Sequence, residues 1–337
     1  MSEDTNISQR KTEHIETVLN EPVEPTVSSF SHYTLPYRAL PEIDIASIDT
    51  SVSFLGKTLS FPFLISSMTG GPEKGGLINK HLAEGAERAQ VALALGSMRV
   101  LLRKPESLAS FDVRQYCPSI PLFGNMGLVQ LNYGYGADDI NRIVDLIHAD
   151  GMFLHINPIQ EAIQPEGNTD FSGLLSKLEA VIKKVSVPVL IKEVGTGIHP
   201  EIAKQLRDIG VEWIDVSGTG GTSWSAVENH RRNDSLGDPF DAVGIPTDQA
   251  LIGARTIDGL HLIGGGGVRS GMDVAKAIML GAKLATAAKP FLAPALENSE
   301  VVFDTLEIWK KQFRIAMFCT GVPDVTTLSK ISLEKNG

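Results

Sequence analysis

The chain has 337 residues, a formal net charge of -10 and two cysteines, and these features exclude several classes of protein. With 42% hydrophobic and 21% charged residues it has a globular composition, and its length suits one large α/β domain. The negative charge argues against nucleic acid or an anionic membrane surface as a partner. The polar N-terminus, the absence of a long apolar stretch and the two widely separated cysteines lead us to expect a cytoplasmic protein.

Eight short apolar runs alternate with helical patterns along the chain. Runs with so little polar alternation are typical of strands buried on both faces of a parallel sheet. The predicted strands are Phe61–Met68, Val91–Ser97, Ile120–Met126, Gly151–Asn157, Val187–Val194, Val211–Ser217, His261–Gly266 and Ala282–Ala288. Helical patterns between them include residues 138–149, 171–184, 200–209 and 271–280. Eight such units predict an α/β fold, a closed (β/α)8 TIM barrel over residues 60–337, with an open doubly wound sheet as the alternative.

Two segments lie outside this repeat. Residues 1–59 precede the first strand and carry Arg10, Lys11 and His14, and we expect this extension to fold over the mouth of the barrel. Only such a fold-back would make the two basic residues ligands; otherwise they are solvated charges. The connection after the sixth strand, about residues 218–246, is rich in Gly, Ser, Asn and charge and is too long for a plain turn, which predicts a mobile lid.

Polar residues gather where the predicted strands end. In a (β/α)8 barrel these ends form one face, where functional groups lie. The residues are Thr69, Arg99, Asn125, His155, Asn157, Lys192 and Ser217. Lys192 stands in an otherwise apolar strand, so its ammonium needs an anionic partner, either a ligand or a carboxylate. A pair with the adjacent Glu193 is the alternative, but successive strand residues point in opposite directions.

The run of four glycines at Gly264–Gly267 ends the seventh strand and leads into a helix. Backbone amides without side-chain bulk can surround a phosphate near a helix start, and barrels repeatedly place such a site after strands seven and eight. We therefore expect a phosphate site formed by this run and by Ala287 and Ala288, with a flexible turn without a ligand as the alternative.

The segment from His155 to Gly167 follows the fourth strand directly. His155 and Asn157 are two residues apart, so they share one face of the strand and can reach a common ligand, and Gln160 and Glu161 follow in the loop. Glu161 is a hard oxygen ligand of the kind that suits Mg²⁺, which commonly bridges to substrate phosphates. A structural histidine and a simple surface glutamate are the alternatives.

Five motifs in this order carry a family resemblance. They are Arg10–Ile15, Ser67–Gly71, Gly96–Arg99, His155–Gly167 and Gly265–Arg269. The chain resembles the type 2 isopentenyl diphosphate isomerases from about Arg10 to the segment around Gly321. The resemblance implies interconversion of isopentenyl and dimethylallyl diphosphate with reduced FMN and Mg²⁺, NADPH as the reductant of the flavin, and a homo-oligomer, tetramer or octamer.

The resemblance also implies roles for individual residues. The implied FMN contacts are Ser67, Met68, Thr69, Ser97, Asn125, Lys192, Ser217, Thr222, Gly265, Gly266, Gly267, Ala287 and Ala288. The implied substrate contacts are Arg10, Lys11, His14, Ser97, Met98, Arg99, His155, Asn157 and Gln160. Of these, Gln160, His155 and Asn157 would be catalytic, and Glu161 would bind the metal.

Moving the double bond requires a proton at C4 and the removal of another from C2. Gln160 stands where a carboxylate base would be expected, so we interpret the flavin N5 as the acid and base. Two alternatives remain at this point. One is an FMN oxidoreductase of the 2-hydroxy-acid oxidase type, for which the segment from His230 to Arg232 would supply the base and the arginines. The other is a barrel that binds phosphate or flavin without catalysis.

Overall fold

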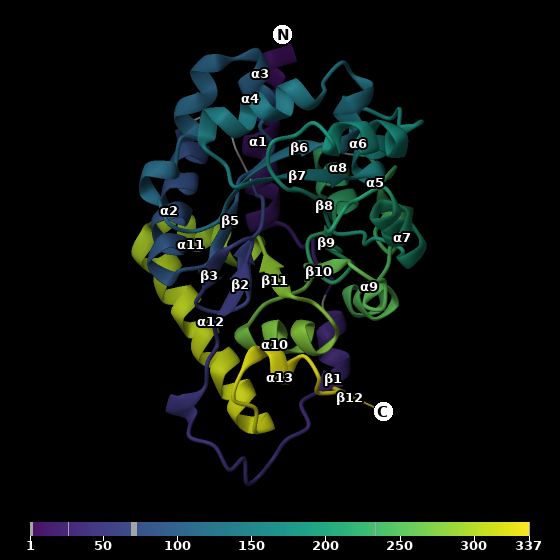
Figure 1. Ribbon diagram of the computed structural model, residues 1–337. Helices are drawn as coiled ribbons and strands as arrows, with labels where there is room; N and C mark the ends of the chain where they lie inside the picture. Colours follow the sequence, from purple (N-terminus) through teal and green to yellow (C-terminus); the bar gives the residue numbers. More distant parts are fainter. Residues whose placement is uncertain (1–2, 26, 69–72, 233, 337) are drawn as a thin grey trace.

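Eight parallel strands close into a barrel in the computed structural model, which describes residues 3–25, 27–68, 73–232 and 234–336 (Figure 1). The side chains of residues 3–10 and 73–74 are outside that description. The strand order around the barrel is β10–β11–β4–β5–β6–β7–β8–β9. The last and first strands pair, with Thr286 opposite Leu64, so the sheet has no edge. The predicted TIM barrel is therefore confirmed and the open sheet is wrong.

All eight barrel strands lie within or beside the predicted runs, and most are shorter. They are β4 (Phe63–Ile65), β5 (Ala92–Ala94), β6 (Leu122–Gly127), β7 (Gly151–Ile156), β8 (Val189–Glu193), β9 (Trp213–Asp215), β10 (His261–Gly264) and β11 (Leu284–Ala287). The apolar runs continue past the hydrogen-bonded ladder because the residues that enter and leave the barrel are buried as well. Two small antiparallel sheets accompany it: β1 (Tyr33–Thr34) with β12 (Glu334–Lys335), and β2 (Val52–Phe54) with β3 (Lys57–Leu59).

Helices surround the barrel in the described part of the chain (Figure 1). They are α1 (Glu3–Asn20), α2 (Glu73–Ala89), α3 (Arg99–Arg103), α4 (Ala137–Ile147), α5 (Pro158–Ile163), α6 (Leu174–Ile182), α7 (Pro200–Asp208), α8 (Trp224–Arg232), α9 (Thr247–Ala254), α10 (Gly271–Met279), α11 (Leu292–Glu297), α12 (Ser299–Thr320) and α13 (Val325–Leu328). None of them combines the length and the apolar character needed to cross a bilayer.

The inside of the barrel is apolar towards the amino ends of its strands. The residues that fill it include Leu64, Phe123, Phe153, Leu190 and Ile263, and the β2–β3 hairpin closes this end with Phe54 and Leu59. Because side chains alternate along a strand, the residue two positions further on also points inward. These next positions hold Ser66, Asn125, His155, Lys192, Asp215, Gly265 and Thr286. A polar layer therefore lies on top of the apolar interior.

The two segments outside the repeat meet above this layer. The helix α8 occupies the connection after the sixth strand, β9, and it contacts both α1 and α5. The N-terminal residues beyond α1 also reach the barrel, since the backbone amide of Ser223 donates to the carbonyl of Val23 at 2.7 Å. The connection at residues 218–246 thus contains a helix where the sequence predicted only a loop.

Candidate active site

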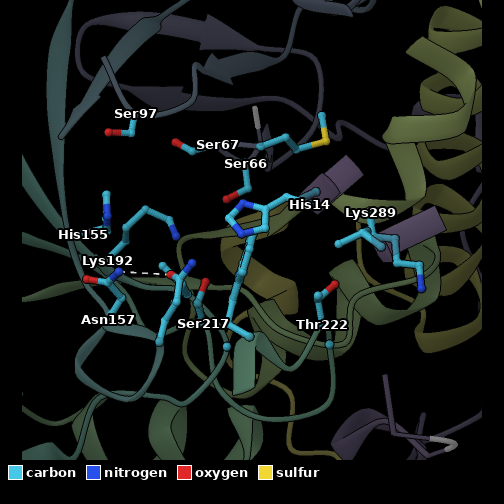
Figure 2. Close-up of a pocket in the computed structure, with 18 of the residues that line it drawn as sticks. His14, Ser66, Ser67, Ser97, His155, Asn157, Lys192, Ser217, Thr222 and Lys289 are labelled. Carbon is cyan, nitrogen blue, oxygen red and sulfur yellow. Dashed lines mark hydrogen bonds between the residues drawn. The ribbon is translucent and has the colours of Figure 1, made fainter. Parts of the chain in front are cut away.

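A cavity of about 260 Å³ opens at the carboxyl ends of the strands, above the polar layer. Figure 2 shows His155, Lys192 and Asn157 on one side of it and Thr222 and Lys289 on the other. The cavity brings together most of the residues singled out from the sequence: Lys11, His14, Ser67, Met68, Ser97, Arg99, Asn125, His155, Asn157, Gln160, Glu161, Lys192, Ser217, Thr222, Gly266, Gly267, Ala287 and Ala288. Of the rest, Thr69 and the side chain of Arg10 lie outside the described residues.

Met98 and Gly265 are not among the described residues that line the cavity. Met98 is fully buried in the hydrophobic core at the start of α3, and its amide donates to the carbonyl of Asn125 at 2.8 Å. Gly265 lies in the polar layer, where an added Cβ would approach Ser217 Oγ to 2.4 Å and Asp215 Oδ1 to 2.6 Å. The sequence identified Gly265 as a phosphate contact, but its lack of a side chain also makes room for Asp215.

His155 is held as a neutral imidazole in this layer. Its Nδ1 lies 2.8 Å from Asn125 Oδ1, and Asn125 Nδ2 donates to Ser67 Oγ at 3.1 Å. Because an amide oxygen only accepts, Nδ1 carries the proton and Nε2 is an acceptor. Burial, aided by the positive charges of Lys192 and Arg99, lowers the pKa of His155 to about 3.

The loop after β7 places two amides beside one carboxylate. Asn157 Nδ2 donates to Gln160 Oε1 at 3.0 Å and to Glu161 Oε1 at 3.1 Å, and Glu161 Oε2 accepts from the amide of Asn168 at 2.6 Å. Asn157 Oδ1 is buried and has no hydrogen-bond partner among the residues that the structure describes. Buried polar atoms are nearly always paired, so this oxygen is available to accept from a group in the cavity.

Glu228 on α8 is a site residue that the sequence reasoning missed. Its Oε1 lies 2.9 Å from His14 Nε2 and accepts from Gln160 Nε2 at 3.1 Å, while Oε2 accepts from Arg231 at 2.5 Å. Burial raises the pKa of this fully buried carboxyl, but His14, Gln160 and Arg231 together lower it below its ordinary value. Trp224 lies one turn earlier, lines the cavity and packs edge-on against His14. Trp224 and Glu228 are four residues apart, a spacing that places them on one face of a helix, and this was the sequence signal that could have identified Glu228.

The glycine run forms the opposite end of the cavity. Gly266 and Gly267 have φ of +94° and +82°, a conformation that favours glycine, and both line the cavity. Two amides at the start of α10 already have acceptors, since Gly271 donates to Gln312 and Asp273 donates to Ser270 Oγ. The loop amides, rather than the helix start, are therefore placed to meet a phosphate.

Cations from two loops surround a carboxylate at this end. Arg269 donates to Glu24 Oε1 at 2.5 Å, Lys289 Nζ lies 3.4 Å from Glu24 Oε2, and Thr222 Oγ1 donates to Oε1 at 3.2 Å. Ser28, in the same N-terminal segment, donates to the carbonyl of Gly267 at 2.9 Å. This segment therefore crosses the glycine run and contributes Glu24 to the cavity.

Lys192 lies beside a buried carboxylate on the next strand. It is in register with Asp215 on β9, and both side chains are buried. Lys192 Nζ donates to the carbonyl of Glu193 at 2.6 Å, whereas the Glu193 carboxylate accepts from the amides of the following loop, including those of Val194 and Gly195 at 2.7 Å. The predicted opposite orientation of Lys192 and Glu193 is consistent with these contacts.

Three comparisons with known proteins bear on this site. The model of the FMN-dependent dehydrogenase family matches residues 159–335. Solved structures of mandelate oxidase (TM-score 0.66, 17% identity, 99% of each chain) and of a lactate oxidase from Pediococcus acidilactici (TM-score 0.67, 19% identity, 92% of this chain and 85% of that one) share the fold.

Sequence relatives are much closer than these structures. Proteins named isopentenyl-diphosphate delta-isomerase are 42% identical in Hydrogenovibrio crunogenus (96% of this chain, 97% of the relative) and 45% identical in Paracoccus zeaxanthinifaciens (95% of each). Identity of this order over nearly the whole length of this chain and of each relative shows that they belong to one family. The chain belongs to the isopentenyl-diphosphate delta-isomerase family, within the wider FMN-dependent dehydrogenase family.

Proposed function

We propose that this protein interconverts isopentenyl and dimethylallyl diphosphate, adding a proton at C4 and removing one at C2, with reduced FMN and Mg²⁺ bound in the cavity. One observation supports the proposal beyond the family name. Gln160 donates to Glu228 and accepts from Asn157, and the neighbouring carboxylates Glu161 and Glu228 are both held by hydrogen-bond donors. The described residues around Gln160 are thus arranged to orient a substrate rather than to exchange protons with it.

The cavity has the features that FMN needs. Gly266, Gly267 and Ala288 present backbone at one end for a phosphate, and Lys192 and Asn125 present polar groups from the floor. The buried Asn157 Oδ1, which has no partner within the described part of the chain, offers an acceptor to a bound group. Reduced FMN, when bound, supplies an electron-rich ring and acid–base chemistry at N5 beside the alkene.

The residues opposite the floor suit an isoprenoid diphosphate. Arg99 is held towards the cavity by Gln130 at 3.0 Å and Asn168 at 2.8 Å, and Lys11 donates to the carbonyl of Ser97 at 3.4 Å, so two cations are placed for phosphate oxygens. Ile15, Val18 and Trp224 give an apolar cover that excludes water from the hydrocarbon part. His155, neutral with an accepting Nε2, adds a second kind of polar contact.

Glu161 is the proposed Mg²⁺ ligand. Groups of three or more acidic, His or Cys side chains that could hold a metal are absent from the described residues, so the ion would need oxygens from the substrate. Mg²⁺ commonly binds in this way, with one or two carboxylates, waters and phosphates. Glu161 is buried, and Asn157 and Asn168 fix both of its oxygens in place beside the cavity.

The oxidase alternative is disfavoured by the contacts of its candidate residues. Arg231 pairs with Glu228, Glu13 and Glu166, and His230 lines a different surface hollow with Asp238. An arginine already bound to three carboxylates is poorly suited to hold a 2-hydroxy acid.

An anaerobic assay tests the proposal directly. The purified protein is given isopentenyl diphosphate with FMN, NADPH and Mg²⁺, and each component is omitted in turn. Dimethylallyl diphosphate formed only in the complete mixture, without stoichiometric loss of NADPH, supports the isomerase with NADPH as reductant. Steady NADPH consumption without product would refute it. The expected tetramer or octamer and the cytoplasmic location stay predictions, which native mass spectrometry and cell fractionation test.

A further inference from the structure

Three titratable side chains share one level of the polar layer. His155, Lys192 and Asp215 lie in register on β7, β8 and β9, so they point to the same side of the sheet. Two residues earlier these strands place Phe153, Leu190 and Trp213 in or against the apolar interior. Lys192 is 5% exposed and Asp215 is 1% exposed. Both charged groups are therefore withdrawn from water directly beneath the cavity.

Asp215 is held in one orientation and is incompletely paired. Its Oδ1 accepts from the amide of Ser217 at 3.1 Å and from Ser217 Oγ at 2.8 Å. Its Oδ2 is buried, and no described residue hydrogen-bonds to it. A buried carboxylate in this situation requires a compensating positive charge. Lys192, in register on the neighbouring strand, is placed to supply it: burial raises the pKa of Asp215, and the charge of Lys192 is the largest effect that opposes this rise.

The other charged groups around Lys192 do not replace Asp215. His155 on β7 is neutral, as its lowered pKa indicates, and the Glu193 carboxylate is bound to backbone amides of its own loop. Burial lowers the pKa of Lys192, and Asp215 opposes this shift more strongly than Glu193 does. Gly265, which directly follows β10, leaves the space that Asp215 occupies.

We propose that Asp215 is a positioning residue whose carboxylate keeps Lys192 in its ammonium form at the floor of the cavity, and so sets the reduction potential of the bound flavin. The inference rests on the proposed function because it requires FMN above Lys192. Reduction of FMN to the anionic hydroquinone takes up two electrons and one proton. An ammonium beneath the ring stabilises the resulting negative charge.

The number of protons taken up on reduction predicts how removal of the Asp215 carboxylate changes the midpoint potential. In Asp215→Asn, Lys192 loses its counter-charge and is neutral beside oxidised FMN. Reduction then takes up a second proton, which goes to Lys192. The midpoint potential is expected to fall, and its dependence on pH to steepen, because each proton taken up with two electrons adds about 30 mV per pH unit.

The test titrates FMN-loaded wild-type protein, Asp215→Asn, Lys192→Met and the double variant with dithionite and indicator dyes between pH 6 and pH 9. Asp208→Asn, which removes an exposed carboxylate paired with Lys204, is the matched control and should leave the potential unchanged. In the Lys192→Met background, Asp215→Asn should add nothing. An unchanged potential and slope, as a neutral Lys192–Asp215 pair would give, overturns the proposal. A raised midpoint potential in Asp215→Asn also overturns it, as does an equal effect of Asp215→Asn in the Lys192→Met background.

A second measurement covers the case in which a variant binds FMN poorly. Urea unfolding of the four proteins without flavin gives a double-mutant cycle. The two single changes, summed, should lower the free energy of unfolding by more than the double change does. Independent effects of the two changes overturn the proposed pairing. Failure of the wild-type protein to bind FMN would instead refute the proposed function, because the unfolding cycle needs no cofactor.

Discussion

Replacing Glu228 by glutamine tests whether α8 and the N-terminal helix complete the site. The carboxylate is fully buried and accepts from His14 at 2.9 Å, Gln160 at 3.1 Å and Arg231 at 2.5 Å. Hydrogen bonds to a charged group contribute about 1.5–3 kcal/mol each, and breaking a buried pair costs about 3–5 kcal/mol. Arg231 keeps its ion pairs with Glu13 and Glu166 in this variant. We therefore expect the free energy of unfolding to fall by about 2–4 kcal/mol, near the lower end of these values.

The same substitution should reduce activity while FMN stays bound. Glutamine still accepts one hydrogen bond, but its amide group faces the donors of Arg231 or His14, so Gln160 and α1 lose their fixed positions. A misplacement of about 1 Å lowers turnover by about 10²-fold, which is the expected fall in kcat. The contacts of Glu228 lie away from the glycine run, so the Kd for FMN should change by less than about threefold.

Urea unfolding followed by circular dichroism measures the stability, and the isomerase assay separates kcat from KM. Glu179→Gln is the matched control, since Glu179 is exposed and pairs only across one helical turn with Lys183; its effect should stay within about 0.5 kcal/mol. If Glu228→Gln unfolds like the control and keeps kcat within about threefold of the wild type, Glu228 does not hold the site together and the reasoning is wrong.

Three further changes test other parts of the structure. His155→Gln should flatten the fall in stability from about pH 6.5 towards pH 3, measured by urea unfolding, because the unfolded imidazole gains a proton there and the native one stays neutral; an unaltered pH profile contradicts this. Gly265→Ala should destabilise by about 1–3 kcal/mol, since its Cβ would meet Ser217 Oγ at 2.4 Å, whereas Gly136→Ala, with no atom within 4 Å, should not. Glu161→Gln should raise the Mg²⁺ concentration for half-maximal activity about tenfold; an unchanged requirement would exclude Glu161 as the ligand.

Much of the site could be predicted because the fold brings strand ends together in a regular way. His155 and Asn157 share a face through the two-residue period of a strand, and both line the cavity with Asn125 and Lys192. Asp215 and Ser217 show the same period, so the sequence already held the signal for Asp215. The sequence predicts that Lys192 needs an anion, either a ligand or a carboxylate, and the structure places the Asp215 carboxylate on the neighbouring strand in register with it.

Other site residues were out of reach because their partners are distant in the chain. His14 and Glu228 are separated by 214 residues, and Glu24 meets Arg269 across 245 residues. Their sequence surroundings are polar and rich in small residues, which indicates a loop and hides the short helix that begins at Trp224. Met98 differs from its neighbours Ser97 and Arg99, since its side chain is buried in the core while theirs line the cavity.

The sequence by itself determined the class of fold, the order of the strands and the edge of the barrel that carries the polar residues. These follow from hydrophobic periodicity, which is local and repeats along the chain. Only the tertiary structure decided that the sheet closes through β11 and β4, that Asp215 faces Lys192, and that α1 and α8 meet over the cavity. Such contacts join segments far apart in sequence, and their geometry depends on how the whole barrel packs.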